Sequence, residues 1–178
     1  RQGGWRHRLV NTVHGTLCFV DGPALTPLEL VRWQITNDHQ GMTDGSVAEY
    51  CPAAETIMQQ LASRIAYHGG ACLIIDYGKN DNFNDSLQAV SAHKPVDLFY
   101  ELGNADISHW VDFAALRRAA IISGSRFIGP VTQADFLKAI GIRERAENAA
   151  RFCNADGRRS LFAAFDRLVG AHHMGTAF

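Results

Sequence analysis

The feature of this sequence that most constrains its fold is a helical pattern followed by two glycines and an unbroken apolar run. Between residues 52 and 67, apolar side chains recur every three or four positions, which indicates a helix with one apolar face: Ala54, Ile57, Met58, Leu61 and Ile65. Pro52 suits the first turn of this helix, and Gly69–Gly70 can end it. Residues 71–75 are a short apolar run between glycines, which is typical of a strand buried on both faces. The sequence therefore predicts an α/β unit, with Cys72 as a buried, reduced thiol.

The remaining patterns predict a hairpin near the N-terminus and helices toward the C-terminus. Two apolar runs, Trp5–Val10 and Leu17–Val20, are separated by a short connection, as in a β-hairpin. A helix is expected from its N-cap Asp112 to about residue 123, and Thr132–Asp135 resembles a capping box. The other expected elements are loops at 36–48 and 78–90, helices at 136–141, 143–153 and 158–170, and strands at 125–131 and from residue 174.

Composition and charge exclude several classes of protein. Forty-seven per cent of the 178 residues are hydrophobic, enough for one full core, and no internal repeat or linker divides the chain. Lys plus Arg number 17 and Asp plus Glu 18, and this net charge of −1 argues against a nucleic-acid-binding surface. No run reaches the ~18 apolar residues of a membrane span. The four cysteines form no C-x-x-C pair, which argues against a zinc ribbon and favours a reducing compartment.

No familiar catalytic motif occurs in the chain, so the first candidate site residues come from position alone. The patterns G-x-G-x-x-G, G-x-x-x-x-G-K-[ST], H-E-x-x-H and G-x-S-x-G are all absent. Ligands in open α/β sheets bind beyond the carboxyl ends of the strands, which makes Asp76 and Tyr77 candidates. Asp76 could instead satisfy backbone donors at the strand end, and Tyr77 could be an aromatic residue at the edge of the core.

More polar residues follow the predicted strand. Gln88 lies in the polar segment, and His93 is either a loop histidine or a functional one. The spacing Asp106-x-x-His109-x-x-Asp112 would suit a metal ion, but Asp112 is better explained as an N-cap, so no metal site is predicted. These residues predict an α/β domain with a site after the buried strand, and they do not name a reaction.

Several blocks of sequence stand out together along nearly the whole chain. They are Glu49–Ala54, Gly69–Gly78, Ser86–His93, Gly103–Phe113, Gly129–Leu137, Gly141–Arg145 and the Met174–Gly175 ending. Gly103–Phe113 is similar to a G-x-A-D-[LI]-[ST]-x-x-V-D-F segment. In this order the blocks resemble the MidA-like family of class I S-adenosylmethionine-dependent methyltransferases. Trp110 stands where that family often has His, and Leu102 where it often has Pro.

The resemblance implies a fold and a place for the cofactor. Residues 1–178 would be one incomplete domain, the C-terminal half of a larger catalytic domain. It would hold the C-terminal part of a Rossmann-like α/β sheet with a β-hairpin insertion and added C-terminal helices. The family's glycine-rich loop and its ribose-binding acidic residue lie upstream of Arg1. S-adenosylmethionine is therefore expected to bind mainly to the absent N-terminal half, and this chain alone is expected to be inactive.

The resemblance also implies an activity and a partner. Methyl transfer to a protein arginine is expected, as in the family's mitochondrial member, which assists the assembly of respiratory complex I. A carboxylate would orient a guanidinium and take its proton, which makes Asp76 the first expected catalytic residue; His93 is the second expected one. The expected substrate-binding residues are Tyr77, Gln88, Asp106 and His109. The expected partner is a protein such as a respiratory complex subunit, and the expected location is the bacterial cytoplasm or the mitochondrial matrix.

Two other functions stay open. One is a non-catalytic protein-interaction and assembly module that retains the fold, for which the hairpin and the loop 36–48 are candidate docking surfaces. The other is a different α/β enzyme, such as an oxidoreductase, against which the absence of a dinucleotide fingerprint argues.

Overall fold

The chain forms two compact units, each built from two segments of sequence. The computed structural model describes residues 4–33, 35, 45–81 and 85–177. The first unit comprises Arg1–Tyr50 and Phe83–His109, and the second comprises Cys51–Asn82 and Trp110–Phe178. Most of the predicted loop 36–48 lies outside the described residues.

An antiparallel hairpin and a short helix begin the first unit. Strands β1 (Arg6–Val13) and β2 (Thr16–Ala24) pair through a two-residue turn, His14–Gly15, in which both residues have positive φ (50° and 80°). Such turns follow the right-handed twist of the strands, so the predicted hairpin is confirmed and is longer than expected. Helix α1 (Pro27–Arg32) follows, with Thr26 and Glu29 in a capping box. The hydrogen bond from the Thr26 backbone N–H lowers the pKa of Glu29 below its ordinary value of 4.5.

A three-stranded antiparallel sheet completes the first unit. Its strand order is β5–β4–β6, with β4 at Gln88–Ser91, β5 at Lys94–Val96 and β6 at Asp106–Ser108. The prediction of a loop from 78 to 90 is therefore wrong at both ends, because Gly78 and Lys79 pair as a strand and Gln88 begins β4. On one face of this sheet Ala89 is 2% exposed, whereas its paired neighbour Ile107 is 59% exposed.

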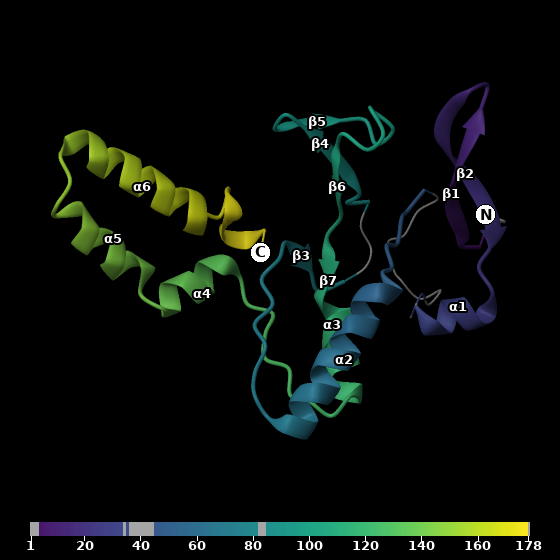
Figure 1. The fold of residues 1–178 in the computed structure, drawn as a ribbon, viewed down its shortest axis with the longest axis horizontal. Helices are drawn as coiled ribbons and strands as arrows, with labels where there is room; N and C mark the ends of the chain where they lie inside the picture. Colours follow the sequence, from purple (N-terminus) through teal and green to yellow (C-terminus); the bar gives the residue numbers. More distant parts are fainter. Residues whose placement is uncertain (1–3, 34, 36–44, 82–84, 178) are drawn as a thin grey trace. The chain divides into compact units, whose positions relative to one another are not determined.

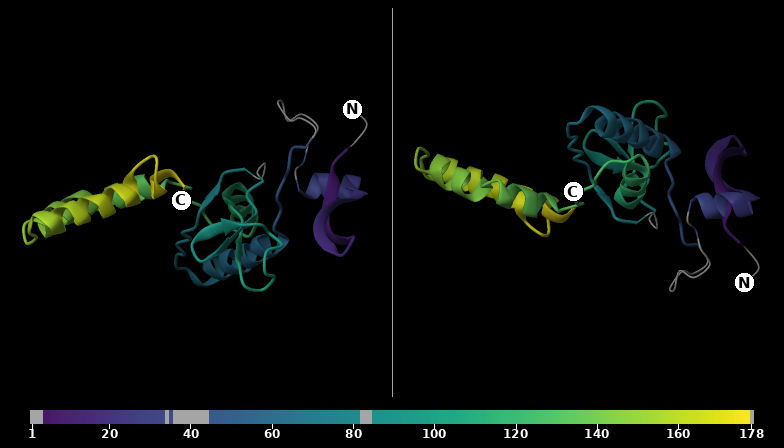
Figure 2. Two further views of the ribbon diagram at one scale, coloured as in Figure 1. Left: turned by 90° about the horizontal axis from the view of Figure 1, so that it is seen from above. Right: turned by 90° about the horizontal axis from the view of Figure 1, so that it is seen from below.

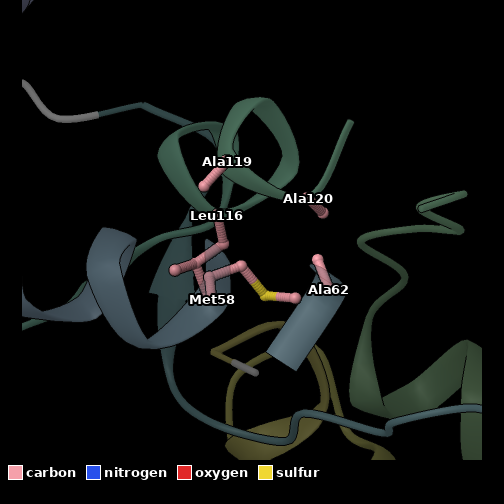
Figure 3. Close-up of a cluster of buried hydrophobic side chains, with 5 residues drawn as sticks. All are labelled: Met58, Ala62, Leu116, Ala119 and Ala120. Atoms are coloured by element: carbon pink, nitrogen blue, oxygen red, sulfur yellow. The ribbon is translucent and has the colours of Figure 1, made fainter. Parts of the chain in front are cut away.

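The core of the second unit lies between two helices, α2 (Pro52–His68) and α3 (Phe113–Ile122), as Figure 3 shows. Both helices confirm the sequence prediction. The buried face of α2 differs from the predicted one, because Ile57 and Leu61 are 57% and 38% exposed whereas Ala62 is fully buried. Small side chains let the two helices approach closely: Ala62, Ala119 and Ala120 are at most 3% exposed, and Met58 and Leu116 fill the space beside them.

The predicted buried strand is the main correction. Residues 71–77 form no strand and run as a coil between α2 and β3 (Figure 1), and Cys72 is exposed rather than buried. Only the next two residues pair: β3 (Gly78–Lys79) runs parallel to β7 (Val111–Asp112). A central parallel strand needs neighbours and covering layers on both sides, and the described residues supply one short neighbour. The approach there is close, because a Cβ on Gly78 would lie 2.2 Å from the Val111 carbonyl oxygen.

Three helices and a 3₁₀ turn form the C-terminal part of the second unit. They are α4 (Gln133–Ala139), α5 (Ile142–Ala150), α6 (Ala155–Val169) and η1 (Met174–Thr176), and α5 lies beside α6 in every view of Figures 1 and 2. Thr132 caps α4 by accepting the Asp135 N–H, as predicted. The strands predicted at 125–131 and from residue 174 are wrong, because neither segment has a strand beside it among the described residues.

We expect Ala62→Leu to destabilise the second unit. The larger side chain has no room between α2 and α3, and overpacking of this kind costs about 1–3 kcal/mol. Urea unfolding followed by circular dichroism measures the change. Ala66→Leu, on an exposed face of the same helix, is the matched control and should leave the midpoint nearly unchanged. Equal midpoints for the two variants would contradict the close helix contact.

Candidate functional site

Asp76 and Tyr77 lie directly before the parallel pair of strands in the second unit. Asp76 Oδ1 accepts the backbone N–H of Tyr77 at 2.8 Å, and the Tyr77 carbonyl accepts the Val111 N–H at 3.1 Å. Both side chains are half-buried. By accepting this N–H, Asp76 satisfies a backbone donor, which is the structural alternative to a functional role that the sequence left open. Asp76 Oδ2 has no hydrogen-bond partner among the described residues, so it can accept a donor from a ligand.

A cation of β3 contacts the aromatic residue that precedes β7. The Lys79 ammonium is 4.2 Å from the centre of the Trp110 ring, within the range of a cation–π contact. Trp110 is one of the two positions at which the sequence departs from the family pattern. The contact gives the indole ring a structural role at the start of β7.

Two of the predicted substrate-binding residues share a face of the sheet in the first unit. Gln88 is opposite Ser108, and Val90 is opposite Asp106, in the antiparallel pairing of β4 with β6. Side chains at paired and alternate positions point to the same face, so Gln88 and Asp106 are diagonal neighbours. The Gln88 side-chain amide donates to the Ser108 hydroxyl at 3.4 Å. Gln88 and Asp106 are exposed on this face, whereas Val90 and Ser108 are half-buried, so it can offer a carboxylate and an amide oxygen to a cationic ligand.

The two candidate histidines lie at the ends of strands in the first unit. Ala92 and His93 form the tight turn between β4 and β5, with φ of 49° and 62°, and His93 is exposed at its tip. Two consecutive positive φ values are typical of a two-residue hairpin turn. His109 follows β6 and is exposed. His93 therefore lies in a loop as expected, and the turn itself gives it a structural role.

Of the three residues whose spacing would suit a metal ion, Asp106, His109 and Asp112, the last has a structural role instead. Asp112 is the N-cap of α3, as predicted, and its Oδ1 accepts the Ala115 N–H at 3.0 Å. Its Oδ2 lies 3.8 Å from Nη2 of Arg118, as an ion pair. Within the described part of the chain, no three His, Cys, Asp or Glu side chains gather closely enough to hold a metal ion.

Glu49 is a residue to which sequence analysis assigned no role. Its Oε1 accepts the backbone N–H groups of Ser86 and Leu87, each at 2.9 Å, and its Oε2 accepts the Ser86 hydroxyl. One carboxylate thus holds the chain directly before Gln88, across 37 residues of sequence. The signal in the sequence was the place of Glu49 in one of the blocks that carry the family resemblance.

The described residues lack the local features with which many proteins hold a nucleotide cofactor. Every buried side-chain nitrogen and oxygen among them has a hydrogen-bond partner, and none of their strands leads into a helix through a glycine-rich loop. They therefore do not form a phosphate-binding cradle of that kind by themselves. None of the helices that the structure describes has both the length and the apolar character that crossing a membrane requires.

Comparison with known proteins connects these elements to one family. Residues 1–131 match the model of the family described as "Putative S-adenosyl-L-methionine-dependent methyltransferase". The mitochondrial protein arginine methyltransferase NDUFAF7 of Homo sapiens is 34% identical over 180 residues, which cover 98% of this chain and 39% of that protein. The protein of the same name from Danio rerio is 34% identical over 184 residues, covering 99% and 41%. The chain thus spans about two-fifths of the length of these curated relatives.

Two crystal structures from Burkholderia thailandensis share the fold. One is the structure of an uncharacterised protein, with a TM-score of 0.73 and 22% sequence identity. The match covers 98% of this chain and 47% of that protein's chain. The other was solved with bound S-adenosyl-homocysteine, with a TM-score of 0.74 and 21% identity over 99% and 46%. At this identity the likeness concerns the fold alone.

We expect Glu49→Ala to weaken the first unit around β4. The change removes the acceptor of two backbone N–H groups and a hydroxyl, a loss of about 1–3 kcal/mol. Amide hydrogen exchange at Ser86 and Leu87, together with urea unfolding, measures it. Glu49→Gln keeps an acceptor oxygen and should lose less, and Glu147→Ala on the exposed side of α5 is the control. Unchanged exchange in Glu49→Ala would contradict the anchoring role.

Proposed function

Because this chain belongs to that family of S-adenosyl-L-methionine-dependent methyltransferases, we propose that it is the C-terminal, acceptor-side part of a protein arginine methyltransferase. The observation that carries the proposal is collinear identity of 34% along 98% of the chain to a relative of that name. The family match over residues 1–131 supports it. The same match favours methyl transfer over the oxidoreductase alternative.

The chain's own residues would act on the acceptor. S-adenosylmethionine supplies an electrophilic methyl group when it is bound. Asp76 Oδ2 would accept a hydrogen bond from the acceptor guanidinium, orient its attacking nitrogen and take up its proton. His93 is a second proposed catalytic residue. Tyr77, Gln88, Asp106 and His109 are proposed to bind the acceptor segment.

Cofactor binding is proposed to depend mainly on the part of the methyltransferase that lies outside this chain. The chain spans about two-fifths of its relatives, and its described residues form no phosphate-binding cradle by themselves. Residues 1–178 would then be the C-terminal half of a larger domain with a Rossmann-like sheet, and would be inactive alone. We propose a protein acceptor, such as a respiratory complex subunit, in the mitochondrial matrix or the bacterial cytoplasm.

A non-catalytic assembly module is the second candidate function. The observation that favours it is the apolar surface of the hairpin, where Leu9, Val10 and Val13 are 45%, 55% and 42% exposed. A module of this kind would use the exposed hairpin to contact a partner and would not turn over substrate.

Calorimetry with S-adenosylmethionine tests the proposal. We expect no binding by the 178-residue chain and binding by the same chain extended upstream in its native gene. The reason is that the family resemblance puts the glycine-rich loop and the acidic residue that hold the cofactor upstream of Arg1. Absence of binding by both chains would reject the methyltransferase assignment and favour the assembly module.

Asp76→Asn tests the proposed acceptor role. In the extended chain we expect methyl transfer to an arginine-containing peptide to fall about 100-fold or more, because an amide cannot take up the proton. Cofactor affinity should stay the same. Glu147→Gln, an exposed carboxylate of α5, is the matched control. Unchanged turnover in Asp76→Asn would remove Asp76 from the catalytic residues.

A further inference from the structure

Two consecutive residues of β1, His7 and Arg8, contact different parts of the first unit. His7 Nε2 lies 3.3 Å from Oε1 of Glu29 on α1, and the His7 ring meets the Trp33 ring edge-on, with 5.7 Å between their centres. Arg8 Nη1 donates to Oδ1 of Asp85, 77 residues along the chain, at 3.0 Å. Strand β1 is therefore tied both to α1 and to the segment that leads into β4.

Arg8 also contacts an aromatic pair that joins the hairpin to the three-stranded sheet. Its guanidinium carbon lies 5.3 Å from the centre of the Phe19 ring on β2, which is the distance of a cation–π contact. The Phe19 ring lies 5.1 Å from the ring of Phe99. Asp85 precedes β4, and Phe99 follows β5. The hairpin thus contacts both the chain that enters β4 and the chain that leaves β5.

These two segments lie at the same end of the sheet. Strand β4 is antiparallel to β5 and to β6, so its start lies beside the ends of both neighbours. Gln88 begins β4 opposite Ser108, and His109 follows at the end of β6. The turn that carries His93 is at the opposite end of the sheet. The hairpin therefore holds the end that carries Gln88 and His109.

A second set of contacts closes a ring around the start of β4. The Glu49 carboxylate accepts two backbone N–H groups of the segment that enters β4, each at 2.9 Å. The next residue, Tyr50, packs its ring against Trp33, with 4.9 Å between the ring centres. Trp33 is the residue that His7 contacts. The contacts thus lead from β1 to the start of β4 and return to β1 through α1, and side chains fixed by such neighbours hold a precise geometry.

We propose that Arg8 is a positioning residue for the methyl acceptor, because its hold on Asp85 sets the place of Gln88 and His109 at this end of the sheet. Arg8 acts through Asp85 and does not touch the reacting groups. The proposal rests on the proposed function, in which Gln88 and His109 bind the acceptor segment. It gives the hairpin a role inside the acceptor site of the enzyme.

The ion pair is suited to positioning more than to overall stability. The side chains of Arg8 and Asp85 are 42% and 59% exposed, and ion pairs as exposed as this add little to the free energy of unfolding. Loss of the pair should therefore change the local position of the segment before β4 and leave the fold intact. A urea midpoint for Arg8→Gln equal to that of the unsubstituted protein checks that the variant is folded.

Kinetics of the full-length protein encoded by the native gene test the proposal, with an arginine-containing peptide as acceptor. For Arg8→Gln we expect the KM for the peptide to rise about fivefold, the value of one exposed ion pair with its cation–π contact. The kcat and the affinity for S-adenosylmethionine should stay the same, since only acceptor binding is weakened. An unchanged KM, or a loss confined to kcat, would overturn the proposal.

Two further variants provide the rescue and the matched control. Arg8→Lys keeps a cation beside Asp85 and Phe19, so its KM should stay close to that of the unsubstituted protein. Arg6→Gln removes an exposed arginine from the same strand, and it should leave the KM unchanged. A rise in KM of the same size in Arg6→Gln would overturn the assignment to Arg8.

A double-mutant cycle tests whether Arg8 acts through Asp85. Asp85→Asn should raise the KM by the same factor as Arg8→Gln, and the double variant should raise it no further. The reason is that two residues of one contact are not additive. Multiplied effects in the double variant would show that the two residues act independently, which would overturn the proposal.

Hydrogen exchange separates this proposal from the proposed function, because it needs no substrate. In Arg8→Gln, a peptide spanning residues 85–91 should exchange faster, and a peptide spanning α4 should not change. Faster exchange at 85–91, in a protein that transfers no methyl group, supports the link from the hairpin to β4 and rejects the proposed function. Methyl transfer with unchanged exchange and unchanged KM in Arg8→Gln supports the proposed function and rejects the role of Arg8.

Discussion

The close contact between α2 and α3 is the constraint on which the second unit depends. The side chains of Ala62, Ala119 and Ala120 are almost completely buried, and their small size lets the backbones of α2 and α3 approach closely. Helix α2 leads through the coil into β3, and β7 leads directly into α3. The helix contact therefore brings the two short strands together, and the glycine at Gly78 permits the close approach of β3 to the Val111 backbone.

The candidate acceptor residues are held mainly by bonds to the backbone and to near neighbours. Asp76 binds the next backbone N–H, Gln88 binds Ser108 on the adjacent strand, and Glu49 holds the chain that leads into β4. None of these bonds needs a bound cofactor. The local geometry of these residues is therefore set by the chain itself.

Helices and their caps could be predicted from the sequence, and strands mostly could not. Asp112 and Thr132 cap their helices as expected, because capping depends on residues three positions apart. The hairpin was also predicted, since its two strands are neighbours in sequence. The strands expected at 71–75 and 125–131 do not form, because pairing needs a distant partner that the pattern of one segment cannot supply. The family resemblance, which depends on spacing along the whole chain, is confirmed.

The sequence by itself determined the helices, the hairpin and the family, because each depends on local periodicity, on turn residues or on the order of short blocks. Only the tertiary structure decided which face of α2 is buried and that Glu49 holds the start of β4. It also decided that Leu73 and Ile75 remain exposed. The physical reason is that burial and strand pairing are properties of neighbours in space. An apolar run predicts that its side chains will be buried, and only the structure shows which neighbours bury them.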